Sequence, residues 1–228
     1  MSNTQMLSIG FPAILASSVH DIKNSLTALR ALLSQLENVY QDPKPTEFRQ
    51  LEFETNRMNN CLMQLLTLYK IESSQFCLSI DEQSAADILE DVVAQQSTLL
   101  SLSNVQLLTE CHDDLFCYCD GTLISNALCT LVNNAQRYCR SKILLSVAPE
   151  DDYIVFCIED DGNGYPENLI SSDHKQLPQI DLANGNTGLG LFFTETIAQL
   201  HVKGDKRGFI VTDNNSQFGG ARFKLYLP

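Results

Sequence analysis

Two long stretches in the first third of the chain carry apolar residues at alternating steps of three and four, the spacing of a coiled-coil seam. The first stretch, from about Phe11 to Val39, has this pattern at Leu15, Val19, Ile22, Leu26, Leu29, Leu33 and Leu36. The second, from about Thr46 to Ser73, has it at Phe48, Leu51, Thr55, Met58, Leu62, Leu65 and Tyr69. The segment QDPKP between them stops a helix, because proline cannot continue one. The pattern predicts two long helices that form an antiparallel hairpin.

A lone hairpin of this kind leaves apolar side chains beside its seam uncovered. Ile14, Leu32 and Leu66 are such flanking positions. Two hairpins can cover these side chains by closing a four-helix bundle. We therefore expect a homodimer.

After residue 75 the heptad spacing gives way to short alternating segments. We expect strands at 76–80, 105–111, 115–119, 142–147, 153–160, 208–213 and 221–228, and helices at 84–103, 121–139 and 187–201. The prediction is a multi-domain chain of class α and α+β. Its helical hairpin occupies residues 1–75 and its domain of mixed helices and strands occupies residues 76–228.

Composition narrows the classes of function. A net charge of −13 disfavours binding to nucleic acid and to anionic membranes. No apolar run approaches the roughly 20 residues that span a bilayer, and the first residues lack the basic region of a signal peptide. We expect a cytoplasmic protein with reduced thiols at its eight cysteines.

Cysteines cluster in the expected strand LFCYC. Cys117 and Cys119 alternate there as small buried apolar residues would. Together with Cys111 and His112 they leave a metal site open as an alternative.

The first candidate for chemistry is the sequence HDIKN in the first helix. His20 is followed by Asp21, and Asn24 lies one helical turn further on the same face. A neutral imidazole nitrogen is a nucleophile, and a carboxylate beside it can fix the tautomer and take its proton. Asn24 is placed to orient a water near the same nitrogen. The alternative is a half-buried histidine of the bundle.

The second candidate is the sequence NNAQRY in the helix 121–139. The side-chain oxygen of Asn134 is a hard ligand that suits Mg²⁺, which also takes phosphate oxygens. Arg137 and Tyr138 follow in the next turn, where Arg137 can meet a phosphate. The alternative is an ordinary polar helix face.

The third candidate is the sequence EDDGNGYP directly after the strand 153–160. Asp160 can accept a hydrogen bond from an exocyclic amine, while Gly162 and Gly164 let the backbone approach a planar ring closely. The alternative is a simple turn.

The fourth candidate is the sequence NTGLGLFF, in which glycines lead into a helix. Backbone N–H groups there, together with the helix dipole, can bind phosphate oxygens. The residues concerned are Thr187, Gly188, Leu189, Gly190 and Leu191. The alternative is a loop followed by a helix N-terminus.

Together, and in this order, the four motifs resemble the boxes of the sensor histidine kinases over nearly the whole chain. HDIKNSL at 20–26 looks like the phosphoacceptor box, LLTLYKIESSQ at 65–75 like the end of its hairpin, and GGARFKLYLP at 219–228 like the last strand. Asn134, Arg137 and Tyr138 fall in the box that binds ATP with Mg²⁺, Asp160, Gly162 and Gly164 in the adenine-binding turn, and Thr187–Leu191 in the glycine box. The resemblance implies an α/β sandwich of the Bergerat (GHKL) type.

The resemblance also implies an activity. ATP would phosphorylate His20 with Asp21 as base, and the phosphoryl group would pass to an aspartate of a response regulator receiver domain. Asn24 would support dephosphorylation of that partner. Lys175 is the only lysine or arginine between Gly164 and Gly190, and we hypothesise that it reaches the γ-phosphate.

Thr130 stands four residues before Asn134, where many family members have a second asparagine. Since only about ten residues precede the first helix, we expect a separate sensory protein to supply the signal in trans. Two other functions stay open. One is a histidine phosphotransferase or relay adaptor with little ATP-dependent activity, and the other is a Bergerat-fold serine kinase of the anti-sigma type.

Overall fold

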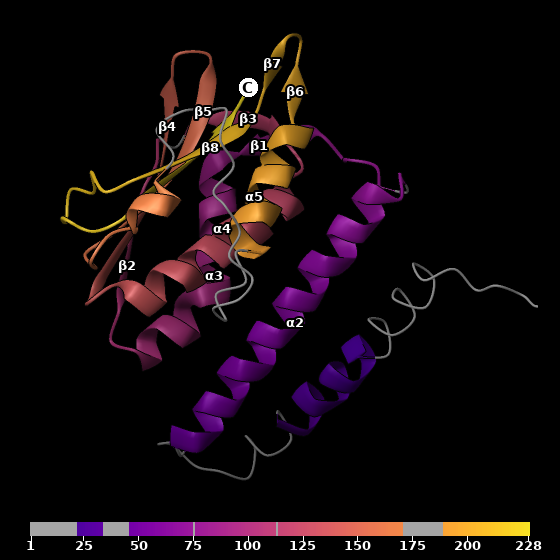
Figure 1. Cartoon of the computed structure of the whole chain (residues 1–228), viewed down its shortest axis with the longest axis vertical. Coiled ribbons are helices and arrows are strands. Elements are labelled where there is room, and N and C mark those ends of the chain that lie inside the picture. The colour runs from indigo at the N-terminus through magenta and orange to yellow at the C-terminus, as the bar shows by residue number, and fades with distance from the viewer. Residues whose placement is uncertain (1–21, 34–45, 75, 113, 171–188) are drawn as a thin grey trace, which may run out of the picture. The chain divides into compact units, whose positions relative to one another are not determined.

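The chain divides into two compact units in a computed structural model, Met1–Phe76 and Cys77–Pro228. The structure describes residues 22–33, 46–74, 76–112, 114–170 and 189–228 (Figure 1). The predicted beginning and end of the first helix and the linker QDPKP lie outside these ranges.

The first unit is helical where it is described. Residues 22–33 form a helix, and α2 runs over Thr46–Glu72, within one residue of the predicted end. Some residues of the predicted seams are buried, namely Leu26, Leu33, Phe48 and Thr55. Leu32 is 57% exposed, as its flanking position predicted, and Leu51 of the seam is 46% exposed. Apolar surface therefore remains uncovered within a single copy of this unit.

The second unit is built on a five-stranded mixed sheet with the order β2-β4-β5-β9-β8. Its strands are β2 (Gln106–Glu110), β4 (Lys142–Glu150), β5 (Tyr153–Asp160), β8 (Phe209–Asp213) and β9 (Arg222–Leu227). β2 pairs with β4 in parallel, and the other pairs are antiparallel. The long strands β4 and β5 begin at or next to the predicted residues.

Three helices cover one face of this sheet (Figure 1). They are α3 (Ala85–Leu102), α4 (Gly121–Tyr138) and α5 (Leu189–Leu200). α4 buries Ile124, Leu128 and Val132, and the sheet contributes fully buried residues such as Phe156 and Leu225. The predicted α/β sandwich is thus confirmed for this unit, and burial of this apolar surface is the main source of its stability.

The opposite face of the sheet carries polar groups and aromatic rings. Arg222 pairs with Asp213 and Lys224 with Glu150, each at 2.8 Å. The ring of Phe209 stacks on that of Tyr226 with 4.3 Å between centroids. This alternation along β9 is typical of an antiparallel strand with one buried and one solvated face.

The start of α4 and the end of α5 are joined by a buried histidine. Asp120 caps α4 by accepting a hydrogen bond from the Leu123 N–H at 3.1 Å. The Asp120 N–H in turn donates to His201 Nε2 at 3.1 Å, and His201 Nδ1 lies 2.8 Å from the Ile197 carbonyl oxygen. Burial lowers the pKa of His201, so the structure favours the neutral ring.

Two small sheets complete the unit. β1 (Asp81–Ser84) pairs with β3 (Phe116–Cys119), and β6 (Val202–Lys203) pairs with β7 (Lys206–Arg207). A short 3-10 helix, η1, spans Glu167–Leu169. The prediction of a strand at 76–80 was wrong, because the pairing with β3 begins only at Asp81.

The cysteines of β3 are buried, as predicted for an apolar role, with Cys117 at 3% exposure and Cys119 at 0%. Within the described ranges, no three histidine, cysteine or acidic side chains are grouped so that they could hold a metal ion. The metal site considered for this strand therefore finds no support. None of the helices in the described part of the chain is long and apolar enough to cross a membrane.

Candidate functional site

The candidate site centres on the turn that follows β5. Asp160, the last residue of that strand, is buried with 4% exposure. Its Oδ1 accepts hydrogen bonds from the N–H groups of Gly162 at 2.8 Å and Ala221 at 3.1 Å. These two hydrogen bonds fix the carboxylate. No described group forms a hydrogen bond with Oδ2, so that oxygen is available to a ligand.

The environment of the Asp160 carboxylate favours a ligand that donates a hydrogen bond. Burial raises the pKa of Asp160, and the N–H groups of Gly162 and Ala221 offset part of this effect. An amine of a ligand that donates to the second carboxylate oxygen would form a charge-assisted hydrogen bond there, which is stronger than a neutral one. From the sequence we expect a hydrogen bond of this kind from an exocyclic amine to Asp160.

Asp161, the next residue, has a different role. Its carboxylate accepts hydrogen bonds from the N–H groups of Arg140, Ser141 and Lys142 at 2.7 to 3.2 Å, and from the Ser141 hydroxyl at 2.8 Å. Although burial acts in the opposite direction, these bonds hold the pKa of Asp161 well below its usual range. Asp161 fixes the start of β4 and is not free to bind a ligand.

Close backbone approach explains the first glycine of this turn. A Cβ at Gly162 would overlap the carbonyl oxygen of Tyr138, and it would lie 2.9 Å from Asp160 Oδ1. A Cβ at Gly220, on the neighbouring loop, would overlap the Asp160 carbonyl oxygen. Gly164 has φ of +79°, a conformation that side-chain-bearing residues rarely adopt. Any larger residue at 162 or 220 would therefore displace Asp160.

A loop at 214–220, which the sequence analysis did not single out, supports the turn. Asn214 Oδ1 accepts from the Tyr165 N–H at 2.6 Å, and its Nδ2 donates to the Tyr165 carbonyl oxygen at 2.9 Å. The Ser216 hydroxyl donates to the Asp160 carbonyl oxygen at 2.7 Å. The turn-forming sequence DNNSQFGG was the available signal for this loop.

The glycine box lies against the asparagine of α4. A Cβ added at Gly190 would lie 2.7 Å from Thr130 Cγ2 and 3.3 Å from Asn134 Nδ2. The first turn of α5 therefore packs directly on the part of α4 that carries Asn134. Two motifs that are more than fifty residues apart in the sequence are brought together, as the function predicted for them requires.

The other predicted residues of this unit are placed as follows. Arg137 and Tyr138 end α4 and are exposed, although the Tyr138 backbone borders Gly162. Leu189 and Leu191 are half-buried in the first turn of α5. Thr187, Gly188 and Lys175 lie outside the described residues.

In the helical unit, Asn24 is described and exposed, on the helix of residues 22–33. His20 and Asp21 lie outside the described residues. The structure therefore gives no geometry for the expected phosphoacceptor.

The residues present suit adenine and Mg²⁺. Asp160 offers a hydrogen-bond acceptor that the N–H groups of Gly162 and Ala221 hold in place. Asn134 is half-buried, and no described residue forms a hydrogen bond with its side chain. A neutral amide oxygen in that position is a suitable Mg²⁺ ligand when phosphate oxygens complete the coordination.

Comparison with known families supports this assignment. Residues 119–228 match the family described as histidine kinase-, DNA gyrase B-, and HSP90-like ATPase. The match contains α4, β4, β5, α5, β8 and β9, and so every described element of the candidate site in this unit.

Curated relatives are sensor proteins. The chain is 29% identical to the sensor protein BasS of Escherichia coli over 91% of this chain and 55% of that protein. It is 26% identical to the sensor histidine kinase CpxA of Escherichia coli over 94% and 46%, and 24% identical to the heme sensor protein HssS of Staphylococcus haemolyticus over 92% and 45%. The chain thus spans about half the length of the curated relatives it matches.

Solved structures share the fold. The histidine kinase AdeS of Acinetobacter baumannii matches with a TM-score of 0.59 at 22% identity, covering 91% of this chain and 96% of that one. Full-length ShkA in complex with AMPPNP matches with a TM-score of 0.66 at 17% identity, covering 95% and 46%.

Proposed function

We propose that this chain, a homologue of the sensor histidine kinases with a histidine kinase-, DNA gyrase B- and HSP90-like ATPase domain in residues 119–228, is an ATP-dependent protein histidine kinase. The observation that carries the proposal is the packing of Gly190 on Asn134 beside the turn of Asp160. A relay adaptor without ATP-dependent activity has no use for this arrangement.

In the proposed complex the chain holds ATP from three sides. Asp160 accepts a hydrogen bond from the adenine amine, and the ring lies against the backbone of the turn at Gly162, whose N–H group holds the carboxylate in place. The backbone N–H groups at the start of α5 face the phosphates, where a helix N-terminus favours negative charge. Asn134 would hold Mg²⁺, which neutralises phosphate charge when it is bound.

The proposed reaction is transfer of the γ-phosphoryl group to His20. The bond between the γ-phosphorus and the bridging oxygen breaks, a nitrogen–phosphorus bond forms at His20, ADP leaves, and the imidazole proton passes to Asp21. The phosphoryl group then moves to an aspartate of a response regulator receiver domain. Asn24 supports dephosphorylation of that partner by orienting the water that hydrolyses its aspartyl phosphate to aspartate and inorganic phosphate.

We further propose that residues 1–75 act as a dimerisation and phosphoacceptor hairpin and residues 76–228 as the catalytic domain. The exposed apolar side chains of the helical unit support a dimeric four-helix bundle. Leu32, Leu51 and Met58 are each at least 45% exposed in one copy, and a second hairpin would cover them.

Calorimetric titration of the full chain with ATP and Mg²⁺ tests the nucleotide site. Asp160→Asn should weaken ATP binding by about tenfold to a hundredfold, since hydrogen bonds to charged groups contribute about 1.5–3 kcal/mol. Asp151→Asn is the matched control, because Asp151 is exposed in the turn between β4 and β5 and its φ of +54° suits asparagine. Absence of ATP binding by the wild type would favour the relay adaptor instead.

A further inference from the structure

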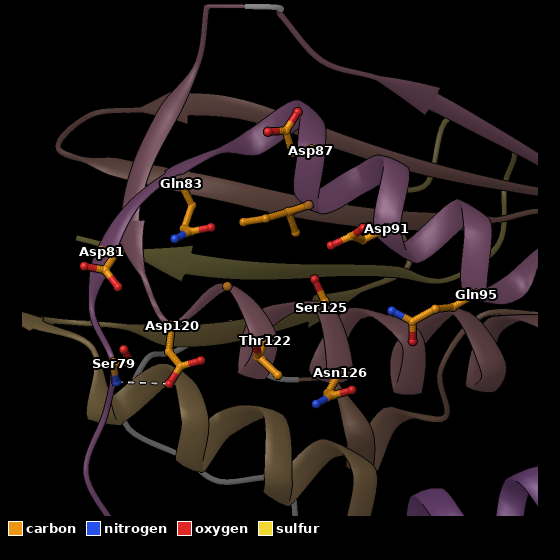
Figure 2. A pocket seen from close by; sticks show the side chains of 12 residues that line it. Ser79, Asp81, Gln83, Asp87, Asp91, Gln95, Asp120, Thr122, Ser125 and Asn126 are labelled. Carbon is orange, nitrogen blue, oxygen red and sulfur yellow. Dashed lines mark hydrogen bonds between the residues drawn. The ribbon is translucent and has the colours of Figure 1, made fainter.

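A pocket lies in the unit Cys77–Pro228, between β1, α3 and the start of α4 (Figure 2). It has a volume of about 340 Å³ and an open mouth. None of the residues that line it belongs to the candidate nucleotide site. The pocket is therefore a separate feature that ATP binding does not explain.

Four carboxylates line this pocket: Asp81, Asp87, Asp91 and Asp120. Asp120 already accepts hydrogen bonds from the N–H groups of Leu123 and Ser79, both at 3.1 Å. No described lysine or arginine pairs with the other three, and none lines the pocket. The pocket thus concentrates negative charge that the described part of the chain leaves uncompensated.

An unpartnered hydroxyl lies among these carboxylates. Ser125 of α4 is only 6% exposed, and its side chain points into the pocket (Figure 2). No hydrogen bond joins Ser125 Oγ to any described residue. The hydroxyl is therefore available to a donor or acceptor of a ligand that enters the pocket.

The arrangement of the carboxylates favours an extended organic cation over a metal ion. No three of them are grouped so that they could hold a metal ion within the described residues. Spread charges of this kind suit an extended cation, and the volume is in the range that encloses a whole small molecule. Ile88, 4% exposed, adds an apolar wall against which methylene groups can pack.

We propose that this pocket binds a linear aliphatic diamine or polyamine. Its ammonium groups lie at Asp81, Asp87 and Asp91, and one of them donates a hydrogen bond to Ser125 Oγ. The methylene chain between them rests on Ile88. This site functions independently of the proposed kinase activity.

Titration of the full chain with spermidine at physiological ionic strength, followed by calorimetry, tests the proposal. Asp91→Asn should weaken binding by about tenfold, because a charge-assisted hydrogen bond is lost. Glu90→Gln is the matched control: it removes the same charge from the adjacent, exposed position of α3, which does not line the pocket. It should change affinity by about twofold or less, as expected for a screened surface charge.

Ser125→Ala separates a built site from general attraction to an acidic surface. It changes no charge, and it should weaken spermidine binding by about threefold to tenfold.

1,4-Diaminobutane should also bind more tightly than n-butylamine, which has the same carbon chain and one ammonium group. Equal effects of Asp91→Asn and Glu90→Gln, or no saturable binding by the wild type, would overturn the proposal. The readout needs neither ATP nor phosphotransfer, so its failure would leave the kinase proposal untouched.

Discussion

The two units of this chain differ in how far their apolar side chains are buried within a single copy. In the second unit, Cys77–Pro228, the residues Phe156 and Leu225 are fully buried between the sheet and its covering helices. In the helical unit, Leu32 and Leu51 remain about half exposed although they belong to or flank a heptad seam. A sheet covered by helices closes its core within one chain, whereas a two-helix hairpin needs a second layer to do so.

This difference in burial predicts that the two units differ in rigidity and in how their stability depends on protein concentration. The second unit can hold the candidate site rigidly, because Asp160 is fixed by backbone N–H groups inside a complete core. In the proposed dimer the helical unit would bury its exposed apolar side chains by association, so its stability should depend on protein concentration. The predictions below test this contrast, starting with the largest expected effect.

Phe156→Ala should destabilise the second unit by about 3–5 kcal/mol, since it removes a fully buried aromatic ring and leaves a cavity. Urea unfolding followed by circular dichroism measures the change. Because the core of this unit is closed within one chain, the loss should be the same at every protein concentration. A loss below about 1 kcal/mol would show that this core is not closed around Phe156.

Leu51→Ser should weaken dimerisation by at least about tenfold, because burial of a leucine side chain contributes about 1.5–3 kcal/mol and the change occurs in both copies. Sedimentation equilibrium gives the dissociation constant. Val202→Ser is the control, since Val202 is exposed to a similar degree, 53% against 46%, but lies in the second unit. If the wild type is a monomer, or if both substitutions act alike, the contrast between the units fails.

The smallest of the expected effects concerns His201. Its contribution to the free energy of unfolding should depend on pH. Burial lowers its pKa in the folded state, so the folded chain binds this proton less readily than the unfolded chain does. The stability that neutral His201 provides is therefore present above about pH 6.5, the pKa of a free histidine, and is lost as the pH falls below it.

His201→Gln tests this directly, because glutamine can accept from the Asp120 N–H but does not titrate. The difference in unfolding free energy between wild type and variant should shrink as the pH is lowered from 7.5 to about 5. A difference that stays constant over this interval would mean that His201 does not lose its stabilising role on protonation.

Elements with strong periodicity could be predicted closely from the sequence. α2 begins at the predicted residue Thr46, α4 begins at Gly121, and β5 spans the predicted residues 153–160. Long segments of this kind contain enough regularly spaced apolar residues to indicate their secondary structure without tertiary information. The polar strand β1 does not, because its sequence DEQS has no apolar alternation and is extended only by pairing with β3. The strands β6 and β7 have two residues each and were missed for the same reason.

The sequence singles out the residues of the candidate site but not the groups that hold them in place. Three acidic residues follow one another at 159–161, and the sequence does not tell which side chain is free. The structure assigns structural bonds to Asp161 and a free oxygen to Asp160. The hydrogen bonds from Asn214 and Ser216 link segments about fifty residues apart, a distance at which local patterns carry no information.

Autophosphorylation with γ-labelled ATP and Mg²⁺ tests the central claim most directly. The wild type and the control Asp151→Asn should gain a label that is lost in acid and stable in base, as expected for a nitrogen–phosphorus bond. His20→Gln should remove the acceptor and Asn134→Ala the metal ligand, so both should lose the label. An acid-stable label, or a label that persists in His20→Gln, would contradict the account of this chain as a histidine kinase.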